Sequence, residues 1–504
     1  MPGLNELLRK GDIASSHRPW PRAVVSVEAW HEAIAGLAGG QWLLLGLWGE
    51  PDRVHMALRD ETDETVAVVT LDCPARRYPS VALHHPPALR LERAARDLFG
   101  LEPTGLPDLR GWLDQGNWGV RHPLAAAPDP APIDKAYAFL PIEGDGLHQI
   151  PVGPVHAGII EPGHFRFTAN GETVVRLEER LGYVHKGIEG LMAGATLEAA
   201  AKLAARTSGD STVAYGLAFA LAVESALGVE ASARAAWLRA LMAEMERVAN
   251  HLGDFGAICN DASFSLIQAH CAVLREKVLR TAQSAFGHRL MRDRIIPGGV
   301  TCDIDADGSA AIRTLIADIE ALFPALVELY DNTASLQDRT VTTGTVKPHL
   351  ARQYAPGGYV GRASGRAFDV RRNLAYAPYD KMRFDVPALD AGDVNARVWI
   401  RIREIEQSLA LIAQLLDGMP QGALAIELPQ DRGSCEGLSM VEGFRGDILV
   451  WLRLGAGSRI GRCHLRDPSW FQWPLLEAAI EDNIVADFPL CNKSFNCSYS
   501  GHDL

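Results

Sequence analysis

The chain has 504 residues, of which 47% are apolar and 22% charged, a composition typical of folded globular proteins and not of disordered chains. This length exceeds what one ordinary hydrophobic core holds, so we expect two or more domains. The formal net charge of −13 argues against nucleic acid or an anionic membrane surface as a direct partner.

Two apolar runs come closest to the character of a membrane span, and they begin at Ile34 and Val213. A polar or charged residue interrupts each run before it reaches about 18–20 apolar positions. The start, MPGLNELLRKGD, lacks the apolar segment of a signal peptide. We therefore expect a cytoplasmic chain that reaches a membrane only through partner subunits.

The N-terminal region is predicted to be a small α/β unit. The runs WLLLGLW from Trp42, RVHMALR from Arg53 and TVAVVTL from Thr65 carry branched and aromatic residues in partial alternation, as strands do. Apolar residues at helical spacing predict a helix over Leu91–Phe99, with Gly100 placed to end it. The Pro/Ala-rich run PLAAAPDPAP that follows indicates an interdomain linker. We place a first domain at 1–124, a linker at 125–135 and a second domain at 136–504.

The second domain is predicted to be mainly helical. In SARAAWLRALMAEMERVANHLGDFGAICND, apolar residues from Leu238 to Leu252 recur at spacings of three and four, as in the buried seam of a helix bundle. Another helix is predicted from Ala396 to Met419. A solvated or inter-helix polar face is predicted for the polar residues of the first helix, which are Glu246, Arg247, Asn250, His251 and Asp254.

Strand-like sequence returns near the C-terminus in GDILVWLRL and RIGRCHLRD. Between these runs, GAGSRIG (Gly455–Gly461) looks like a dinucleotide fingerprint, but no helix follows it and no acidic residue stands at the expected distance. We predict a glycine hairpin there and no nicotinamide site in this chain. The expected fold class is α+β: a small N-terminal α/β domain, then a mainly helical-bundle domain with β segments near its N- and C-terminal ends.

The segment RTSGDS (Arg206–Ser211) precedes a long apolar, helix-like stretch. By itself it predicts a helix N-terminus capped by Ser208, Asp210 or Ser211. A phosphate loop does not fit, because the glycine spacing and the lysine are missing. None of the eight cysteines forms a CxxC pair, so we expect isolated buried thiols and not a zinc site or a self-contained iron–sulfur cluster.

Dense motifs in a fixed order resemble a known family. The N-terminal unit, especially YPSVALHHPPALRLERAARDLFGLEPTGLPDLRGW, resembles the C-type subunit of the proton-pumping NADH:quinone oxidoreductase. The rest resembles the D-type subunit of that enzyme and the large subunits of membrane-bound, energy-converting nickel–iron hydrogenases, in which both parts are likewise fused in one chain. The motifs that carry this resemblance include GPVHAGIIEPGHFRF (Gly153–Phe167), GYVHKGIEGLM (Gly182–Met192), EMERVANHLGDFGAICND (Glu244–Asp261), GRASGRAFDVRRNLAYAPYDKMRFDV (Gly361–Val386), VEGFRGDILVWLRL (Val441–Leu454) and NIVADFPLCNKSFNCSYSGHDL (Asn483–Leu504).

The resemblance argues against a metal centre. Hydrogenase large subunits hold nickel and iron on four thiolates, from an early RxCGxC and a late DPCxxC motif, and soft thiolates suit these metals. The early motif aligns with Arg206–Ser211 and has serine at both cysteine positions. At most one thiolate of four remains, so we expect no nickel–iron centre and no metal. The degenerate ligand positions are Ser208, Ser211, Cys497 and Ser500.

The other branch of the family reduces quinone at the same place, without a metal in this subunit. There a tyrosine on the loop matching RTSGDS and a histidine on the loop matching GPVHAGIIEPGHFRF hold the head group. This chain offers His156 and His164, and which of them aligns stays open. No tyrosine lies between Arg206 and Thr212. The candidate quinone-binding residues are His156, His164, Ser208 and Ser211.

Several charged residues are expected to line the former metal site. Glu161 resembles the hydrogenase glutamate that passes protons, and Arg445 matches the arginine that overhangs the metal. A buried Asp210 would need a partner such as Arg206 or Arg445. A desolvated Glu161 would have a raised pKa suited to proton transfer. The candidate catalytic residues are Asp210, Glu161, Arg445 and Arg206, and a polar plug that only fills space stays an alternative.

The resemblance implies an oxidoreductase subunit of a membrane-bound, ion-translocating redox complex, peripheral on the cytoplasmic side of the cell membrane. The implied partners are an iron–sulfur small subunit, which carries the cluster, and antiporter-like membrane subunits. The cavity would bind quinone or couple proton transfer. Two alternatives remain, a non-catalytic structural coupling subunit and, with less support, a true nickel–iron hydrogenase.

Overall fold

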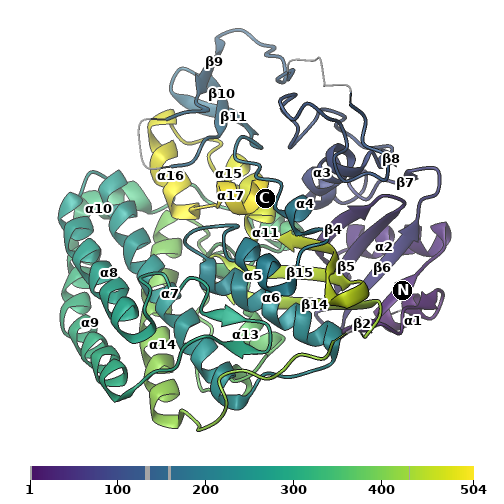
Figure 1. Cartoon of the computed structure of the whole chain (residues 1–504). Helices are drawn as coiled ribbons and strands as arrows, with labels where there is room; N and C mark the ends of the chain where they lie inside the picture. Colours follow the sequence, from purple (N-terminus) through teal and green to yellow (C-terminus); the bar gives the residue numbers. More distant parts are fainter. Residues whose placement is uncertain (1–2, 131–136, 157–159, 431) are drawn as a thin grey trace.

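The structure is a computed structural model that describes residues 3–130, 137–156, 160–430 and 432–504. The fold is α+β, as predicted, with the strand-rich N-terminal part on one side and the long helices on the other (Figure 1). Residues 131–136 lie outside the described residues, and with them most of the C-terminal half of the predicted linker.

A five-stranded sheet forms the centre of the N-terminal part, in the order β1-β3-β6-β5-β4. Its β3–β6 pair is parallel and its other pairs are antiparallel. The helix predicted from apolar spacing is α3, and Gly100 follows it at φ 70°, which confirms both its position and its end. The elements are α1 (Leu4–Leu8), β1 (Asp12–Ile13), β3 (Arg22–Val24), α2 (Val27–Ala38), β4 (Leu43–Glu50), β5 (Arg53–Arg59), β6 (Val66–Asp72), β7 (Arg77–Pro79), α3 (Leu89–Phe99) and β8 (Glu102–Thr104).

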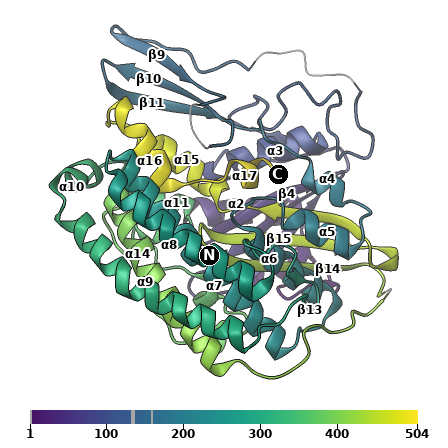
Figure 2. The same cartoon turned by 60° about the vertical axis from the view of Figure 1, so that its left-hand side comes forward.

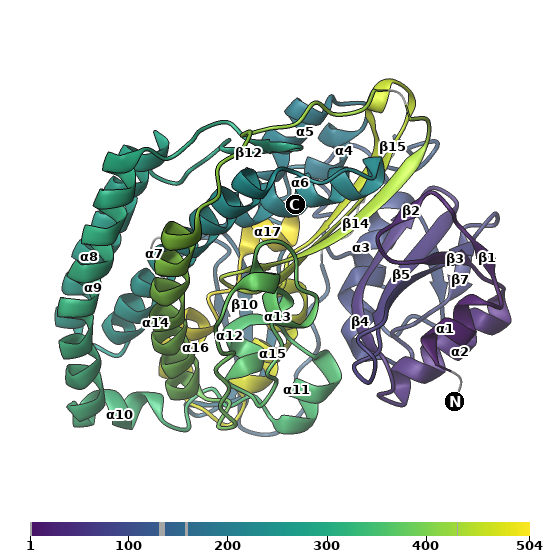
Figure 3. The same ribbon diagram turned by 90° about the horizontal axis from the view of Figure 1, so that it is seen from below.

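The N-terminal part is bound tightly to the rest of the chain. Its short strand β2 (His17–Arg18) pairs with β14 (Cys435–Gly443) and completes a four-stranded sheet with β15 (Gly446–Leu454) and β16 (Ile460–Arg466). The predicted glycine hairpin is confirmed, because β15 and β16 are antiparallel neighbours across it. Figure 3 shows this sheet between the N-terminal domain and the helices.

Trp48 lies at the junction of the two parts. Its ring stacks against His55 at 5.3 Å and His464 at 5.1 Å, and its centroid is 5.5 Å from that of Trp451. The Arg22 guanidinium donates to both carboxylate oxygens of Glu436, at 2.8 and 3.0 Å, in the same buried layer. The N-terminal part and the rest of the chain therefore share one buried interface.

The helical part is arranged around the long helix α7 (Ala233–Asp261), which packs against α8 (Ser265–Phe286), α14 (Val394–Gly418) and α16 (Phe488–Phe495). The predicted seam from Leu238 to Leu252 is buried. Helix α6 (Thr212–Leu227) covers β14 and β15 and is buried along nearly its whole length. The other elements of this part are α4 (Ile188–Met192), α5 (Leu197–Ala204), β12 (Ile295–Ile296), β13 (Gly299–Val300), α9 (Ala306–Asn332), α10 (Ala334–Thr340), α11 (Pro348–Tyr354), α12 (Gly358–Arg362), α13 (Val370–Asn373), α15 (Ser469–Ala479) and α17 (Tyr499–Asp503).

The C-terminal helices lie between the bundle and the three-stranded sheet of β9 (Leu147–Val152), β10 (His164–Asn170) and β11 (Thr173–Arg180) (Figure 2). The last residues are buried, and the carbonyl oxygen of Leu504 accepts from the N–H groups of Lys186 and Gly187 at 2.7 and 3.0 Å. This anchoring fixes the NCSYSG segment beside RTSGDS. Within the described parts of the chain, no helix combines the length and the apolar character that crossing a bilayer requires.

Trp48→Ala tests the interface. The variant should lower the free energy of unfolding by about 3–5 kcal/mol, because it leaves a void between two sheets. Urea denaturation followed by tryptophan fluorescence measures this loss. Val175→Ala, at a side chain that is 45% exposed, is the control and should stay within about 0.5 kcal/mol of wild type. Equal midpoints for the two variants would contradict the shared interface.

Candidate functional site

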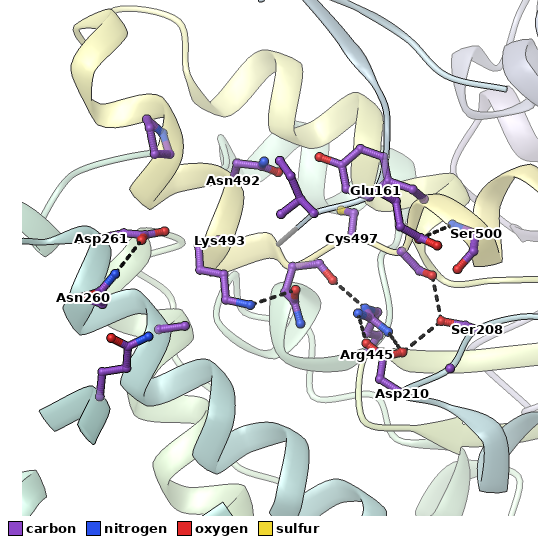
Figure 4. Close-up of a pocket in the computed structure, with 18 residues that line it drawn as sticks. Glu161, Ser208, Asp210, Asn260, Asp261, Arg445, Asn492, Lys493, Cys497 and Ser500 are labelled. Carbon is purple, nitrogen blue, oxygen red and sulfur yellow. Dashed lines mark hydrogen bonds and ion pairs between the residues drawn. The ribbon is translucent and has the colours of Figure 1, made fainter. Parts of the chain in front are cut away.

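A cavity of about 760 Å³ lies where the RTSGDS loop, the junction of α7 and α8, and the C-terminal segment meet. Its wall is rich in polar groups (Figure 4). Asp210 and Arg445 lie on one side, and Lys493, Asn260 and Asp261 lie on the other. The sequence-predicted residues on this wall are Glu161, Ser208, Asp210, Arg445, Cys497 and Ser500.

Asp210 and Arg445 form a bidentate ion pair. Two guanidinium nitrogens of Arg445 donate to the two carboxylate oxygens of Asp210 at 2.7 and 2.6 Å. Arg445 is only 6% exposed, whereas the Asp210 side chain is 35% exposed, toward the cavity. Burial by itself would raise the pKa of Asp210, but the charge and hydrogen bonds of Arg445, with a hydrogen bond from Ser208, lower it to about 2. Asp210 is therefore an anion at neutral pH.

The backbone at the β14–β15 turn fixes the position of Arg445. Gly358 packs against this turn at φ 63°, and a Cβ atom there would lie 2.0 Å from the Arg445 carbonyl oxygen. The Arg445 Nε donates to the carbonyl oxygen of Asn496. The Asn496 amide in turn donates to both carboxylate oxygens of Asp254, at 2.9 and 3.1 Å. The arginine thus joins three distant segments at one wall of the cavity.

The positions that match metal ligands do not form a metal cage. The Ser208 hydroxyl donates to Asp210 at 2.9 Å and lies 2.9 Å from the Ser498 hydroxyl. The Cys497 thiol is directed toward Gln472, and burial raises its pKa well above the usual value, so it stays protonated. In the described part of the chain, no group of three or more His, Cys, Asp or Glu residues is arranged to hold a metal ion. These residues do not fit a nickel–iron centre.

Glu161 lies at the cavity and is not desolvated. Its side chain is exposed, and its carboxylate accepts the Ser500 backbone N–H at 2.9 Å. Ser500 is itself buried and receives a second contact, from the Lys186 ammonium to its carbonyl oxygen. Glu161 therefore stands at the solvent side of the cavity.

The predicted place of Arg206 in the cavity wall is wrong. Its guanidinium donates to both carboxylate oxygens of Asp293 at 2.8 and 2.7 Å, and its side chain is 41% exposed. Asp293, and not Asp210, pairs with Arg206, because the 287–294 segment passes next to the start of the RTSGDS loop. Of the two arginines that could have paired with Asp210, only Arg445 does so.

Neither predicted quinone-site histidine is among the described residues that line the cavity. His156 Nε2 lies 2.7 Å from the Gly163 carbonyl oxygen, and His164 Nδ1 lies 3.2 Å from that of Gly153. Both imidazoles are thus hydrogen-bonded within their own loop. Ser211 is buried behind Asp210, where its hydroxyl accepts from Arg445 at 3.3 Å.

The predicted start of α6 at Ser211 is confirmed, but the predicted side-chain cap is not formed. Ser211 occupies the N-cap position, but no side chain of the RTSGDS loop caps the helix. Glu246 of α7 takes this role, since its carboxylate accepts the N–H groups of Val213 and Ala214 at 2.7 and 3.0 Å. Asp210 cannot do so, because Arg445 holds its carboxylate.

Sequence reasoning missed several residues of this wall. The Lys493 ammonium lies 3.4 Å from Asp254 and 3.2 Å from the Asn496 amide oxygen. Asp261 and Asn260 end α7 at the far side of the cavity. The sequence could have identified these residues as candidates for the site, because they lie in two motifs that carry the family resemblance, EMERVANHLGDFGAICND and NKSFNCSYSG. The inter-helix polar face predicted for α7 is confirmed by its buried ion pairs, such as that of Asp254 with Arg401.

The chain matches two family models. Residues 265–436 match the model described as respiratory-chain NADH dehydrogenase, 49 Kd subunit, and residues 48–129 match that of the 30 Kd subunit. It is 31% identical to formate hydrogenlyase subunit 5 of Escherichia coli (strain K12), covering 86% of this chain and 78% of that protein. It is also 31% identical to hydrogenase-4 component G of the same organism, covering 89% and 80%. The chain belongs to this family of respiratory dehydrogenase and hydrogenase subunits.

Other members extend the family to fused C/D subunits. The C/D-type subunit of NADH-quinone oxidoreductase from Phocaeicola vulgatus is 28% identical over 86% of this chain and 89% of that protein. A chain of the membrane-bound sulfane sulfur reductase, an archaeal respiratory membrane complex, has a TM-score of 0.68 at 26% identity, covering 72% of this chain and all of that one. Family members are thus subunits of membrane-bound respiratory complexes.

Asp210→Asn tests the ion pair. The variant should lower the free energy of unfolding by about 3 kcal/mol, because it leaves the buried Arg445 guanidinium without its anion. Asp293→Asn removes the partner of the exposed Arg206 and should cost under about 1 kcal/mol.

The effect of Asp210→Asn should also depend on pH. Folding lowers the Asp210 pKa from 3.8 to about 2, so its stabilisation is present above pH 3.8 and is lost as the pH falls toward 2. Urea titrations at several pH values would show the two proteins converging at the acid end. A difference between them that does not change with pH would contradict the ion pair as its source.

Proposed function

We propose that this chain is the large peripheral-arm subunit of a membrane-bound, ion-translocating redox complex, and that its cavity couples proton uptake to electron transfer without a nickel–iron centre. The observation that carries this proposal is the Asp210–Arg445 ion pair, which stands where the family resemblance places the metal. A fixed anion and cation at the cavity wall respond to added charge, because the Arg445 guanidinium is buried and interacts with charge more strongly than it would in water.

The residues that line the first cavity support a proton-coupling role more than a dedicated quinone-binding site. Glu161, Asp261 and Lys493 add titratable groups to a cavity that is already polar. The histidines of the quinone interpretation bond within their own loop instead. A volume of about 760 Å³ still admits a small acceptor such as a quinone head group, so quinone analogues remain the right probes.

We infer the partners and the location from the family resemblance. The relatives are subunits of respiratory membrane complexes. In the proposed assembly, this chain docks on an iron–sulfur small subunit that carries the cluster. Antiporter-like membrane subunits would hold the assembly at the cytoplasmic face of the cell membrane.

Metal analysis is the first test. Because serines replace the thiolates and Cys497 stays protonated, we expect far less than one nickel per chain in the purified complex. Mass spectrometry of nickel and iron, with the small subunit's iron counted from a preparation of that subunit alone, checks this. Nickel at one atom per chain would overturn the proposal in favour of a hydrogenase.

Turnover of the intact complex is the second test. Reduced methyl viologen would serve as donor and decylubiquinone as acceptor, with rates normalised to assembled complex. Asp210→Ala should lower the rate by about 100-fold or more, as expected when a group essential for proton transfer is removed. Glu161→Gln, at an exposed position that should not disturb folding, should lower it as well.

Asp293→Ala is the matched control, because it removes a carboxylate of an exposed pair outside the cavity wall. Its rate should equal that of wild type. Unchanged rates in both Asp210→Ala and Glu161→Gln would leave the non-catalytic coupling subunit as the correct interpretation.

A further inference from the structure

A second cavity, of about 270 Å³, lies on the other side of the RTSGDS loop. Gly209 and Asp210 line both cavities, so this loop separates them. The second cavity is bounded by α7, α8 and the segment that follows α8, and its wall is mostly apolar. Arg289 lines this cavity and is exposed, so the cavity reaches the protein surface. Its volume admits several water molecules at about 30 Å³ each.

Glu246 is the second carboxyl group that faces this cavity. It is 7% exposed. No ion pair with a cation is found for it in the described residues, although Glu224, Glu244 and Glu404 in the same bundle each pair with an arginine. The neighbouring Arg247 guanidinium instead donates to the carbonyl oxygens of Glu442 and Gly443 and to the Glu244 carboxylate. A buried carboxyl group without a cation favours its neutral form.

The two carboxyl groups of this cavity hold protons very differently. Burial raises the pKa of Glu246 to about 8, against the hydrogen bonds from α6, and the negative charge of Asp210 adds to the rise. Asp210 stays ionised, with a pKa of about 2. At neutral pH Glu246 therefore holds a proton that it can release, whereas Asp210 holds none and contributes a fixed negative charge. The other charged groups facing Glu246 are Arg247 on its own helix and Arg275, Arg289 and Arg292 across the cavity.

We propose that Glu246 delivers protons from the second cavity to the Asp210–Arg445 site. This inference rests on the proposed function, in which the first cavity takes up protons. In each transfer the Glu246 carboxyl group gives its proton to water beside Asp210 and becomes a carboxylate. The N–H groups of Val213 and Ala214, at the positive end of α6, stabilise that carboxylate. A proton that enters from bulk solvent through the second cavity then restores the neutral acid, and the reduction at the first cavity consumes the proton that Glu246 released, so no net charge accumulates.

Infrared spectroscopy of the isolated full chain tests the proton on Glu246 independently of any turnover. The wild type should show a protonated-carboxyl band that disappears as the pH rises through about 8. Glu246→Gln should lack this component, and Asp210→Asn should retain it with a lower midpoint, because the neighbouring negative charge is gone. A wild-type spectrum identical to that of Glu246→Gln would overturn the proposal, even if the complex couples protons by another route.

The pH profile of the intact complex tests the transfer itself, with the same viologen donor and quinone acceptor. The wild-type rate should fall above about pH 8, where Glu246 loses its proton. Glu246→Gln should lower the rate at neutral pH by about tenfold or more and remove this alkaline limb. A cap-only role would give lower thermal stability with an unchanged pH profile, and that outcome would overturn the proposal.

Glu92 provides the matched control. It is also buried, its pKa is raised to about 7, and its carboxylate accepts the N–H groups of Val81 and Ala82. It lies in the N-terminal domain and lines neither cavity. Glu92→Gln should remove its own infrared component but leave the rate and its pH profile unchanged. If Glu92→Gln changed the profile as Glu246→Gln does, the effect would belong to buried carboxyl groups in general and the proposal would fail.

Discussion

The candidate site depends on one constraint, that the buried guanidinium of Arg445 must have an anion. Asp210 supplies it with both carboxylate oxygens, and this contact fixes the RTSGDS loop against the β14–β15 turn. The same guanidinium holds the Asn496 carbonyl oxygen, so the C-terminal segment is fixed as well. Without Asp210, the buried Arg445 guanidinium would have no counter-ion, and this would destabilise the positions of the RTSGDS loop, the β14–β15 turn and the C-terminal segment together. The ion pair therefore holds together three of the segments that line the cavity.

The interior of the helical part is rich in charge, and its ion pairs follow a common pattern. Arg362 donates to Glu404 at 2.7 Å and to Glu442 at 2.9 Å, and Arg371 donates to Glu244 at 2.9 Å. Each ion pair gives a buried charge an opposite charge that offsets the free-energy cost of its burial. Each also connects elements that are far apart in the sequence. Against this pattern Glu246 stands out, because it faces the second cavity with no ion pair among the described residues.

Local patterns were enough to predict the elements but not the site contacts. The apolar residues spaced three and four apart from Leu238 to Leu252 predicted α7, and Gly100 predicted the end of α3. Each of these signals is local, because it involves only residues of the same helix or the residue next to it. The choice between Arg206 and Arg445 as the partner of Asp210 could not be made locally. It depends on Asp293, 87 residues beyond Arg206, which takes that arginine at the surface. The histidine placement failed for a similar reason, since both imidazoles are hydrogen-bonded to carbonyl oxygens of their own loop and neither lines the cavity among the described residues.

The pairing of Asp210 has a consequence for the helix behind it. An aspartate just before a helix commonly caps it, but here Arg445 occupies the carboxylate, and the N–H groups of α6 need another acceptor. Glu246 supplies that acceptor from a neighbouring helix, and in doing so it is held close to Asp210 without an ion pair of its own among the described residues. The pairing of Asp210 with Arg445 thus leaves an ionised carboxylate and a protonated acid, Glu246, at the same cavity. In the proposed transfer, consumption of the proton by the reduction at the first cavity draws it from Glu246, because the pKa of Asp210 lies well below that of Glu246 and Asp210 itself does not keep the proton.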